Sequence, residues 1–389
     1  MHTRTCIKME KKNSYEFNET EKWTTLPSMK TPRHFFGATA IGEKIHVVGG
    51  LDEEYMYLSS AEVYDIKSKK WSPLPDMNEK RFFCGVTSVG GKVYVVGGDN
   101  GRSLASCEMF DPDTNKWSTI PDMNELHDDC AVCGIGDKLY VIGGYGDYGC
   151  HSCIEVFDTV TQKCSILPNM TDKRDGCAAV SFGNKIYVFG GRDDCYARLS
   201  SVEVYDITTQ EWTRLPDMKE KRVYCAATAV GNRIYIVGGY DGSTHHSSCE
   251  VFNTSTNSWS SLIPDLKEKK WGCEAVTIGT KIYVMGGKNG STSTSSVEVF
   301  AMSMYSLYPV DDNYITVEGG FRSPKSLVNL SSDQLCRSLP DLDGELPPGY
   351  PHDVINTILE SLLSHGALNE TTLKAFRHYG FDQFPLDGC

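Results

Sequence analysis

Residues 44–50 read KIHVVGG, and closely similar stretches follow five more times along the chain. The first glycines of the six doublets are spaced by 46 to 48 residues. A repeat of this period is typical of architectures whose units bury a shared core only when they stack. The doublet glycines, which we expect to be structural, are Gly49, Gly50, Gly97, Gly98, Gly143, Gly144, Gly190, Gly191, Gly238, Gly239, Gly286 and Gly287.

Each repeat carries signals for four short strands. A Gly-X pair such as Gly42-Glu43 precedes the doublet strand, and glycine accepts the positive φ that a tight hairpin needs. A polar loop and a Glu-centred run such as AEVYD (61–65) follow the doublet, and a tryptophan then comes seven residues after the aromatic residue. We expect a structural role for Trp71, Trp117, Trp212 and Trp259, and for Trp23, which lies one residue closer to its aromatic.

The apolar strand, the Gly-Gly doublet and the spaced tyrosine and tryptophan resemble the kelch repeat over residues 14–309. The resemblance implies an all-β fold, a six-bladed β-propeller with four strands in each blade around a central channel. The physical argument agrees, because a ring of stacked units buries both faces of each unit and leaves only short edges.

The two ends of this region read as parts of one repeat. Residues 14–27 match the second half of a repeat, whereas the last unit lacks the Asp and Trp of its fourth strand. We expect 22–27 to supply the outer strand of the last blade and so to close the ring. The alternative is that 304–309 forms this strand and that 14–27 lies elsewhere.

The chain has 389 residues and a net charge of −13, which argues against nucleic-acid binding because phosphate recognition needs a basic face. No run approaches the roughly 18 apolar residues of a membrane span. The start of the chain shows no apolar stretch, so we expect no secretory signal. The odd number of cysteines, 15, predicts reduced thiols. We therefore expect a protein of the cytoplasm or the nucleus.

The segments outside the repeats predict a mobile tail (1–13), an acidic linker (310–350) and a small α-helical appendage, a hairpin at 351–389. Val354, Ile355, Ile358 and Leu359 fall on one helical face. This pattern resembles the opening of an F-box and, more loosely, a LisH hairpin. The resemblance implies docking of another protein, such as a ubiquitin-ligase subunit, through a helix in a groove. The alternative is a hairpin that packs on the propeller or on another chain.

Two sets of opposite charge follow the repeat. The basic set, sixteen residues before each first doublet glycine, is Arg33, Arg81, His127, Arg174, Arg222 and Lys270. The acidic set, one per third strand, is Glu62, Glu108, Glu155, Glu203, Glu250 and Glu298. We expect partly buried ion pairs that tie strands together. The alternative is a basic ring at one mouth of the channel.

The residues just after each basic position vary, and they should meet the loops after the doublets at one mouth. They form an aromatic sector (Phe35, Phe82, Phe83, Tyr224 and Trp271) and, with one later loop, an acidic sector (Asp128, Asp129, Asp175, Asp193 and Asp194), with His34 beside the first. The kelch resemblance implies that this face binds a peptide of a partner, and aromatic anchors beside a charged rim suit such a patch. We expect a partner segment with an apolar anchor and basic residues. The alternative is that these are ordinary solvated loop residues.

Two other features of the sequence could carry chemistry. Cys130-x-x-Cys133 with Cys150-x-x-Cys153 has zinc-like spacing. However, Cys130 occupies a repeat position that four other units also fill with cysteine, which predicts a small apolar core residue. Glu274 replaces the Gly or Ala of other inner strands and should either pair with a basic residue or reach into the channel.

We expect no catalytic site, no metal and no cofactor. The sequence predicts a protein-interaction module, either a substrate-recognition subunit or a scaffold. The alternatives are a ubiquitin-ligase substrate adaptor that docks through 351–380, an actin-associated kelch protein, and a kelch-type enzyme such as an oxidase or an epimerase. Among the histidines only His245 and His246 cluster, and adjacent residues rarely aim at one metal.

Overall fold

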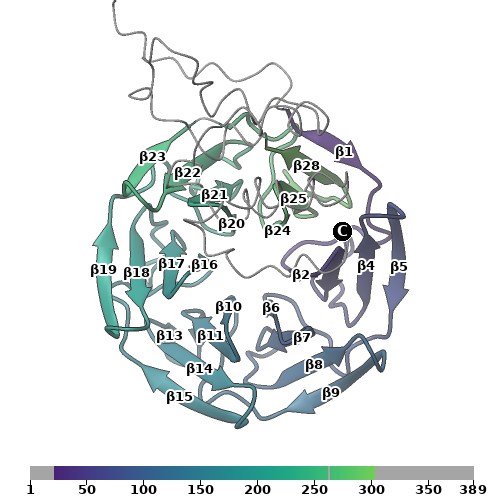
Figure 1. The fold of residues 1–389 in the computed structure, drawn as a ribbon, viewed down its shortest axis with the longest axis horizontal. Coiled ribbons are helices and arrows are strands. Elements are labelled where there is room, and N and C mark those ends of the chain that lie inside the picture. Colours follow the sequence, from purple (N-terminus) through teal and green to yellow (C-terminus); the bar gives the residue numbers. More distant parts are fainter. Residues whose placement is uncertain (1–21, 262, 303–389) are drawn as a thin grey trace, which may run out of the picture. The chain divides into compact units, whose positions relative to one another are not determined.

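The computed structural model describes residues 22–302 except residue 262. Six four-stranded antiparallel sheets stand around a central axis as the blades of a ring (Figure 1). The predicted six-bladed, all-β propeller is thus confirmed. The described residues contain no helix that could cross a membrane. The predicted tail, linker and helical hairpin lie outside them.

The blades are given from inner to outer strand. Blade 1 is β2 (Gly37–Ile41), β3 (Lys44–Val48), β4 (Ala61–Asp65) and β5 (Lys70–Leu74). Blade 2 is β6 (Gly85–Val89), β7 (Lys92–Val96), β8 (Cys107–Asp111) and β9 (Lys116–Ile120). Blade 3 is β10 (Ala131–Ile135), β11 (Lys138–Ile142), β14 (Ile154–Asp158) and β15 (Lys163–Leu167). Blade 4 is β16 (Ala178–Phe182), β17 (Lys185–Phe189), β18 (Val202–Asp206) and β19 (Glu211–Leu215).

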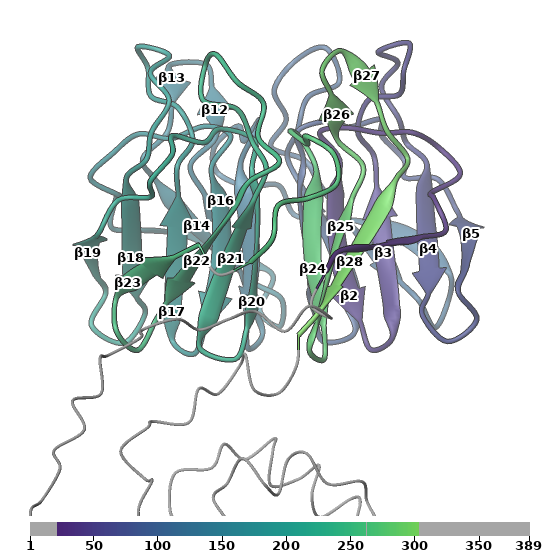
Figure 2. The ribbon, with the colours of Figure 1, turned by 90° about the horizontal axis from the view of Figure 1, so that it is seen from above.

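Blade 5 is β20 (Ala226–Val230), β21 (Arg233–Val237), β22 (Cys249–Asn253) and β23 (Ser258–Ser260). Blade 6 is β24 (Glu274–Ile278), β25 (Lys281–Met285), β28 (Val297–Ala301) and β1 (Thr24–Leu26). Two small hairpins rise from the loops after doublets: β12 (Tyr145–Gly146) with β13 (Gly149–Cys150), and β26 (Lys288–Asn289) with β27 (Thr292–Ser293). Figure 2 shows both on one side of the ring, which we call the loop face.

The doublet positions require glycine because the next blade approaches them closely. A Cβ on Gly49 would lie 2.5 Å from the carbonyl oxygen of Arg81, so only glycine fits there. The amide of Gly50 donates to the same carbonyl over 2.8 Å. The second glycine of every doublet makes the equivalent bond, and the amide of Gly287 donates to the carbonyl of Arg33 in blade 1. The doublet therefore ends one strand and joins each blade to its neighbour.

Blade 6 is closed by the beginning of the chain. Strand β1 pairs antiparallel with β28, with Thr24 opposite Val299 and Leu26 opposite Val297. The prediction that 22–27 provides this outer strand is confirmed, and the alternative of 304–309 in this position is wrong. Trp23 is 3% exposed, and its indole donates to the carbonyl of Pro264 over 2.8 Å.

The other predicted tryptophans make the same contact around the ring. Each indole N–H donates to a proline carbonyl in the segment that follows the outer strand of the preceding blade. The donors are Trp71 to Pro27, Trp117 to Pro75, Trp212 to Pro168 and Trp259 to Pro216, all at 2.8–2.9 Å. In blade 3 the thiol of Cys164 takes this place, 3.5 Å from the carbonyl of Asp122.

The two charge sets meet as six buried pairs, as predicted, so the basic residues do not form a ring at the mouth. The pairs and their N–O distances are Arg33–Glu62 (2.9 Å), Arg81–Glu108 (3.3 Å), His127–Glu155 (2.9 Å), Arg174–Glu203 (3.0 Å), Arg222–Glu250 (3.0 Å) and Lys270–Glu298 (3.9 Å). Each pair lies within one blade and holds the incoming loop onto the third strand.

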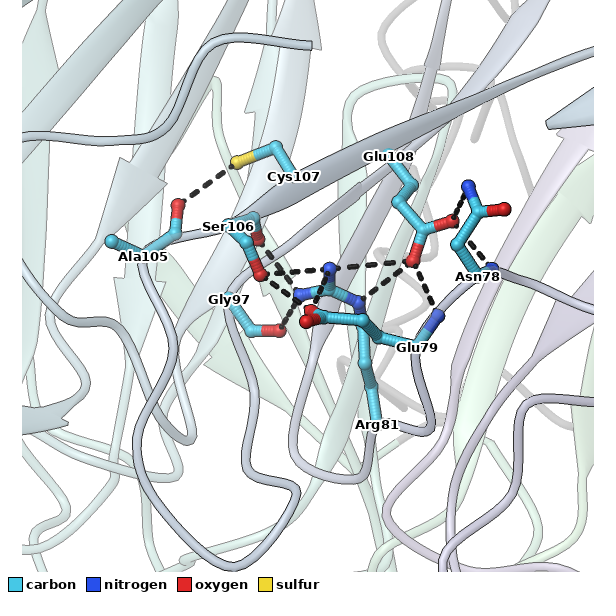
Figure 3. A network of polar contacts seen from close by, with 8 residues as sticks. All are labelled: Asn78, Glu79, Arg81, Gly97, Ala105, Ser106, Cys107 and Glu108. Carbon is cyan, nitrogen blue, oxygen red and sulfur yellow. Dashed lines mark hydrogen bonds and ion pairs between the residues drawn. The ribbon is translucent and has the colours of Figure 1, made fainter. Parts of the chain in front are cut away.

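Figure 3 shows the pair of blade 2 with its surroundings. The Arg81 guanidinium donates to the carbonyls of Gly97 and Ser106, each over 2.8 Å. Glu108 accepts the backbone amides of Asn78 at 2.8 Å and Glu79 at 3.1 Å. The two buried charges therefore have protein partners, which is the condition under which such a pair is tolerated.

We expect Arg174→Ala to lower the free energy of unfolding by about 3–5 kcal/mol, because it leaves the Glu203 carboxylate buried without its partner. Arg214→Ala is the matched control in the same blade. Its side chain is 52% exposed and pairs with Asp172 at 3.5 Å, so the loss should stay below about 1 kcal/mol. Urea unfolding followed by tryptophan fluorescence measures both. Equal losses would contradict a special role for the buried pair.

Trp23→Ala should open the ring where the two ends of the propeller meet. The loss of a buried indole and of its bond to Pro264 is expected to cost about 3 kcal/mol. The exposed neighbour Lys22 provides the control variant Lys22→Ala. Thermal unfolding and hydrogen exchange of β28 check the prediction, and unchanged protection of β28 amides would show that β1 does not close the blade.

Candidate protein-binding face

Six residues form a closed ring of backbone hydrogen bonds around the axis at the loop face. Each amide donates to the carbonyl of the equivalent residue in the preceding blade over 2.9–3.0 Å, and the amide of Phe35 completes the circle with Gly272. All six residues have φ between 53° and 61°. The members of this axial ring are Phe35, Phe83, Asp129, Gly176, Tyr224 and Gly272. The backbone is thereby satisfied, and the side chains are left to differ.

A second ring lies one residue earlier in each repeat. Every member forms a β-bridge with the residue that follows the glycine doublet of the same blade. The bridges are His34 with Leu51, Phe82 with Asp99, Asp128 with Tyr145, Asp175 with Arg192, Val223 with Tyr240, and Trp271 with Lys288. The prediction that both sets of loops meet at one mouth is therefore confirmed.

The aromatic sector is one contiguous cluster. The ring centroid of Phe35 lies 4.2 Å from that of Phe83, 4.9 Å from Tyr224 and 5.3 Å from Trp271. Phe82 contacts Phe83 with centroids 4.7 Å apart. All five rings are half-buried. They therefore offer apolar surface that is already held in place, as an anchoring patch requires.

Two glycines of the axial ring provide the room for this cluster. A Cβ on Gly272 would lie 2.6 Å from the ring of Phe35, and one on Gly176 would lie 2.8 Å from the ring of Tyr224. The Tyr224 side chain passes over Gly176 toward Asp129, and its hydroxyl interacts with that carboxyl. The sequence predicted the aromatic residues as site members but gave no role to these glycines.

The acidic sector is arranged around one arginine. The Nε of Arg192 lies 2.6 Å from Asp175, which is fully buried, and the guanidinium also stands over the ring of Tyr224 at 5.7 Å. Asp128 and Asp129 lie nearby, and each has one buried carboxyl oxygen without a hydrogen-bond partner. Burial, with Asp99 close by, raises the pKa of Asp128 to about 7. Burial and the neighbouring Asp175 also raise the pKa of Asp129.

The remaining members of the acidic sector, Asp193 and Asp194, bind groups of the loops around them. Asp193 accepts the amides of Cys195 and Ala197, each over 2.9 Å. Asp194 pairs with Lys173 at 2.7 Å and accepts the amide of Cys150. These aspartates therefore shape the rim between blades 3 and 4, and Asp128 and Asp129 are the acids with unused acceptors.

The opposite side of the face carries a lysine that the sequence analysis did not select. Lys288 is 5% exposed, and its ammonium lies 2.6 Å from the hydroxyl of Tyr55 and 4.4 Å from the centre of that ring. Its position, directly after a doublet, is also that of Arg192, which is the signal that could have identified it. His34 beside it is 1% exposed, and burial with the nearby Lys288 lowers its pKa to about 4. His34 therefore lies beneath the surface.

A small cavity lies on the axis beneath the aromatic sector, with a volume of about 70 Å³. Its walls are the six residues of the axial ring, the residue after each of them, and Glu274. The residues after the ring are Phe36, Cys84, Cys130, Cys177, Cys225 and Cys273. Glu274 thus reaches into the channel, and the described residues give it no ion pair.

The repeat cysteines behave as buried core residues. Burial raises the pKa of the thiols of Cys84, Cys177, Cys225 and Cys273 to about 12, so they are protonated. Across residues 22–302, no group of three or more His, Cys, Asp or Glu side chains is placed to hold a metal ion. The zinc-like spacing at Cys130 does not produce such a group in this part of the chain.

The chain is a β-propeller built from six sequence repeats, with a candidate binding face at one end of its axis. A family model described as the KLHDC2/KLHL20/DRC7 Kelch-repeats domain matches residues 129–325, and the Kelch motif matches 32–78 and 80–124. The chain belongs to the kelch-repeat family.

Two individual proteins are similar to parts of this chain. Kelch-like protein 41a from Danio rerio is 50% identical over 52 residues, which are 13% of this chain and 8% of that protein. The solved structure of YjhT superposes with a TM-score of 0.65 at 16% identity and covers 72% of this chain and 97% of its own. At this identity the second likeness concerns the fold alone.

Glu274 should make stability depend on pH. Burial raises its pKa from about 4.5 to about 8, so the folded chain keeps a proton that the unfolded chain releases between these values. Stability is therefore lost as the pH rises through this window. Glu274→Gln should melt several degrees above wild type at pH 9 and at the same temperature at pH 4. The exposed Glu211→Gln is the control, and a pH-independent difference would contradict the assignment.

Proposed function

We propose that this protein binds a segment of a partner protein on its loop face. The single observation that carries the proposal is an ordered aromatic cluster on the same face as two buried aspartate oxygens that have no hydrogen-bond partner. A partner with an apolar side chain and a basic side chain next to it complements both. Membership of the kelch-repeat family supports a role in protein–protein interaction.

The two sectors would contribute in different ways. Half-buried rings at the centre of a patch bury apolar area with little loss of side-chain freedom, which is typical of binding hot spots. The carboxyls of Asp128 and Asp129 would contribute specificity, because a partner without a cation would leave them buried and unpaired. Lys288 and Arg192, next to these rings, limit the positions at which a partner cation is tolerated.

We propose that the protein uses this face as a substrate-recognition or scaffolding subunit. The likeness to a kelch-like protein supports such a role in general terms. The more specific role of a ubiquitin-ligase substrate adaptor would depend on docking through 351–380, outside the described residues, and it rests on the sequence resemblance of that segment.

The double variant Asp128→Asn, Asp129→Asn should lose partners that wild type retains, because the amides keep the shape and remove the charge. Phe83→Ala should lose the same partners through the apolar half of the site. Asp113→Asn, an exposed aspartate in the turn between β8 and β9, is the control. Quantitative mass spectrometry of proteins captured by each full-length variant measures the effect. Equal recovery with all four proteins would overturn the proposal.

A further inference from the structure

The acidic sector has fewer cations than carboxyl groups. Asp128, Asp129 and Asp175 lie around Arg192, and the guanidinium makes its ion pair with Asp175. One oxygen of Asp128 and one of Asp129 are consequently buried without a donor. A buried acceptor without a donor is costly, and its cost is removed when a ligand brings the donor.

The axial cavity adjoins this unpaired acid. Asp129 is 9% exposed and is one of the walls of the cavity, and Glu274 forms another wall. The cavity volume of about 70 Å³ is close to that of two water molecules. The end group of one side chain fits.

We propose that Asp129 and the axial cavity bind one primary ammonium group, that of a lysine side chain in the partner segment. This rests on the proposed function and names the residue that the partner must present. The ammonium would accept no hydrogen bond and would donate three, to the buried oxygens of Asp128 and Asp129 once these side chains turn toward it, and into the cavity toward Glu274.

The geometry favours lysine over arginine. An ammonium is a compact point charge, whereas a guanidinium is a planar fork that matches both oxygens of a single carboxylate. The free acceptors here belong to two different residues, Asp128 and Asp129, with one oxygen each. The cluster of Phe35, Phe83 and Tyr224 beside them suits the apolar stem of a lysine and attracts its charge through the ring faces.

The test begins with a library of random dodecapeptides displayed on phage and selected on the full-length protein. We expect the selected peptides to share a lysine at a fixed distance from an aromatic or aliphatic residue. A synthetic copy of the most frequent peptide is then measured by calorimetry in three forms, with lysine, Nε-acetyl-lysine or arginine at that position. Acetylation should weaken binding at least tenfold, and arginine should also bind more weakly.

Protein variants locate the ammonium. Asp129→Asn and Glu274→Gln should each weaken the lysine peptide and leave the acetylated peptide nearly unchanged, while Asp113→Asn should bind both peptides like wild type. The acetylated peptide serves as the internal control for folding, because a misfolded variant would lose both ligands. Loss of discrimination between the two peptides is therefore the specific readout.

The outcomes separate this inference from the function on which it rests. Selected peptides that lack lysine, or that bind Asp129→Asn as tightly as wild type, would overturn the ammonium site and leave the loop face as a binding surface. Equal affinity for lysine and arginine would overturn the choice of an ammonium. Selection of no peptide by the wild-type protein would overturn both the inference and the proposed function.

Discussion

The architecture depends on a charge buried in every blade and surrounded by backbone. The attraction between Arg81 and Glu108 would not by itself stabilise Arg81 in the interior, because the desolvation of the two ions offsets much of that attraction. The carbonyls of Gly97 and Ser106 and the amides of Asn78 and Glu79 complete the site. The pair therefore holds the loop that arrives from the neighbouring blade in one conformation. The residues of the loop face come directly after the paired basic residue in the chain.

Much of this frame could be predicted from the sequence because it is local and repeated six times. The hairpin glycines, the doublets, the tryptophans and the charge sets each recur at a constant spacing, so a single physical interpretation is tested six times within one chain. Closure by Trp23 was predictable for a related reason: the last unit lacks the residues that the beginning of the chain carries. Here the structure adds mainly the partners of each side chain, such as the proline carbonyls.

The site was predictable only as a set of positions. The sequence placed Asp128 and Asp129 together with the aromatic residues, but it could not show that Arg192 is committed to Asp175. It also left open whether Glu274 forms an ion pair or reaches into the channel, and the structure places it in the wall of the cavity. Lys288 was overlooked because, among the residues directly after the doublets, only Arg192 shares its positive charge. Such facts depend on contacts between blades, which spacing along the chain does not encode.

The axial ring has a consequence for how such a face can change over time. Its six hydrogen bonds use only backbone atoms, so any residue that tolerates a left-handed φ can occupy a position without breaking the circle. The side chains are matched to one another, as Phe35 is to Gly272 and Tyr224 is to Gly176. Matched substitutions at two ring positions can therefore give the face a new specificity. The hydrogen-bonded ring and the blades around it stay intact.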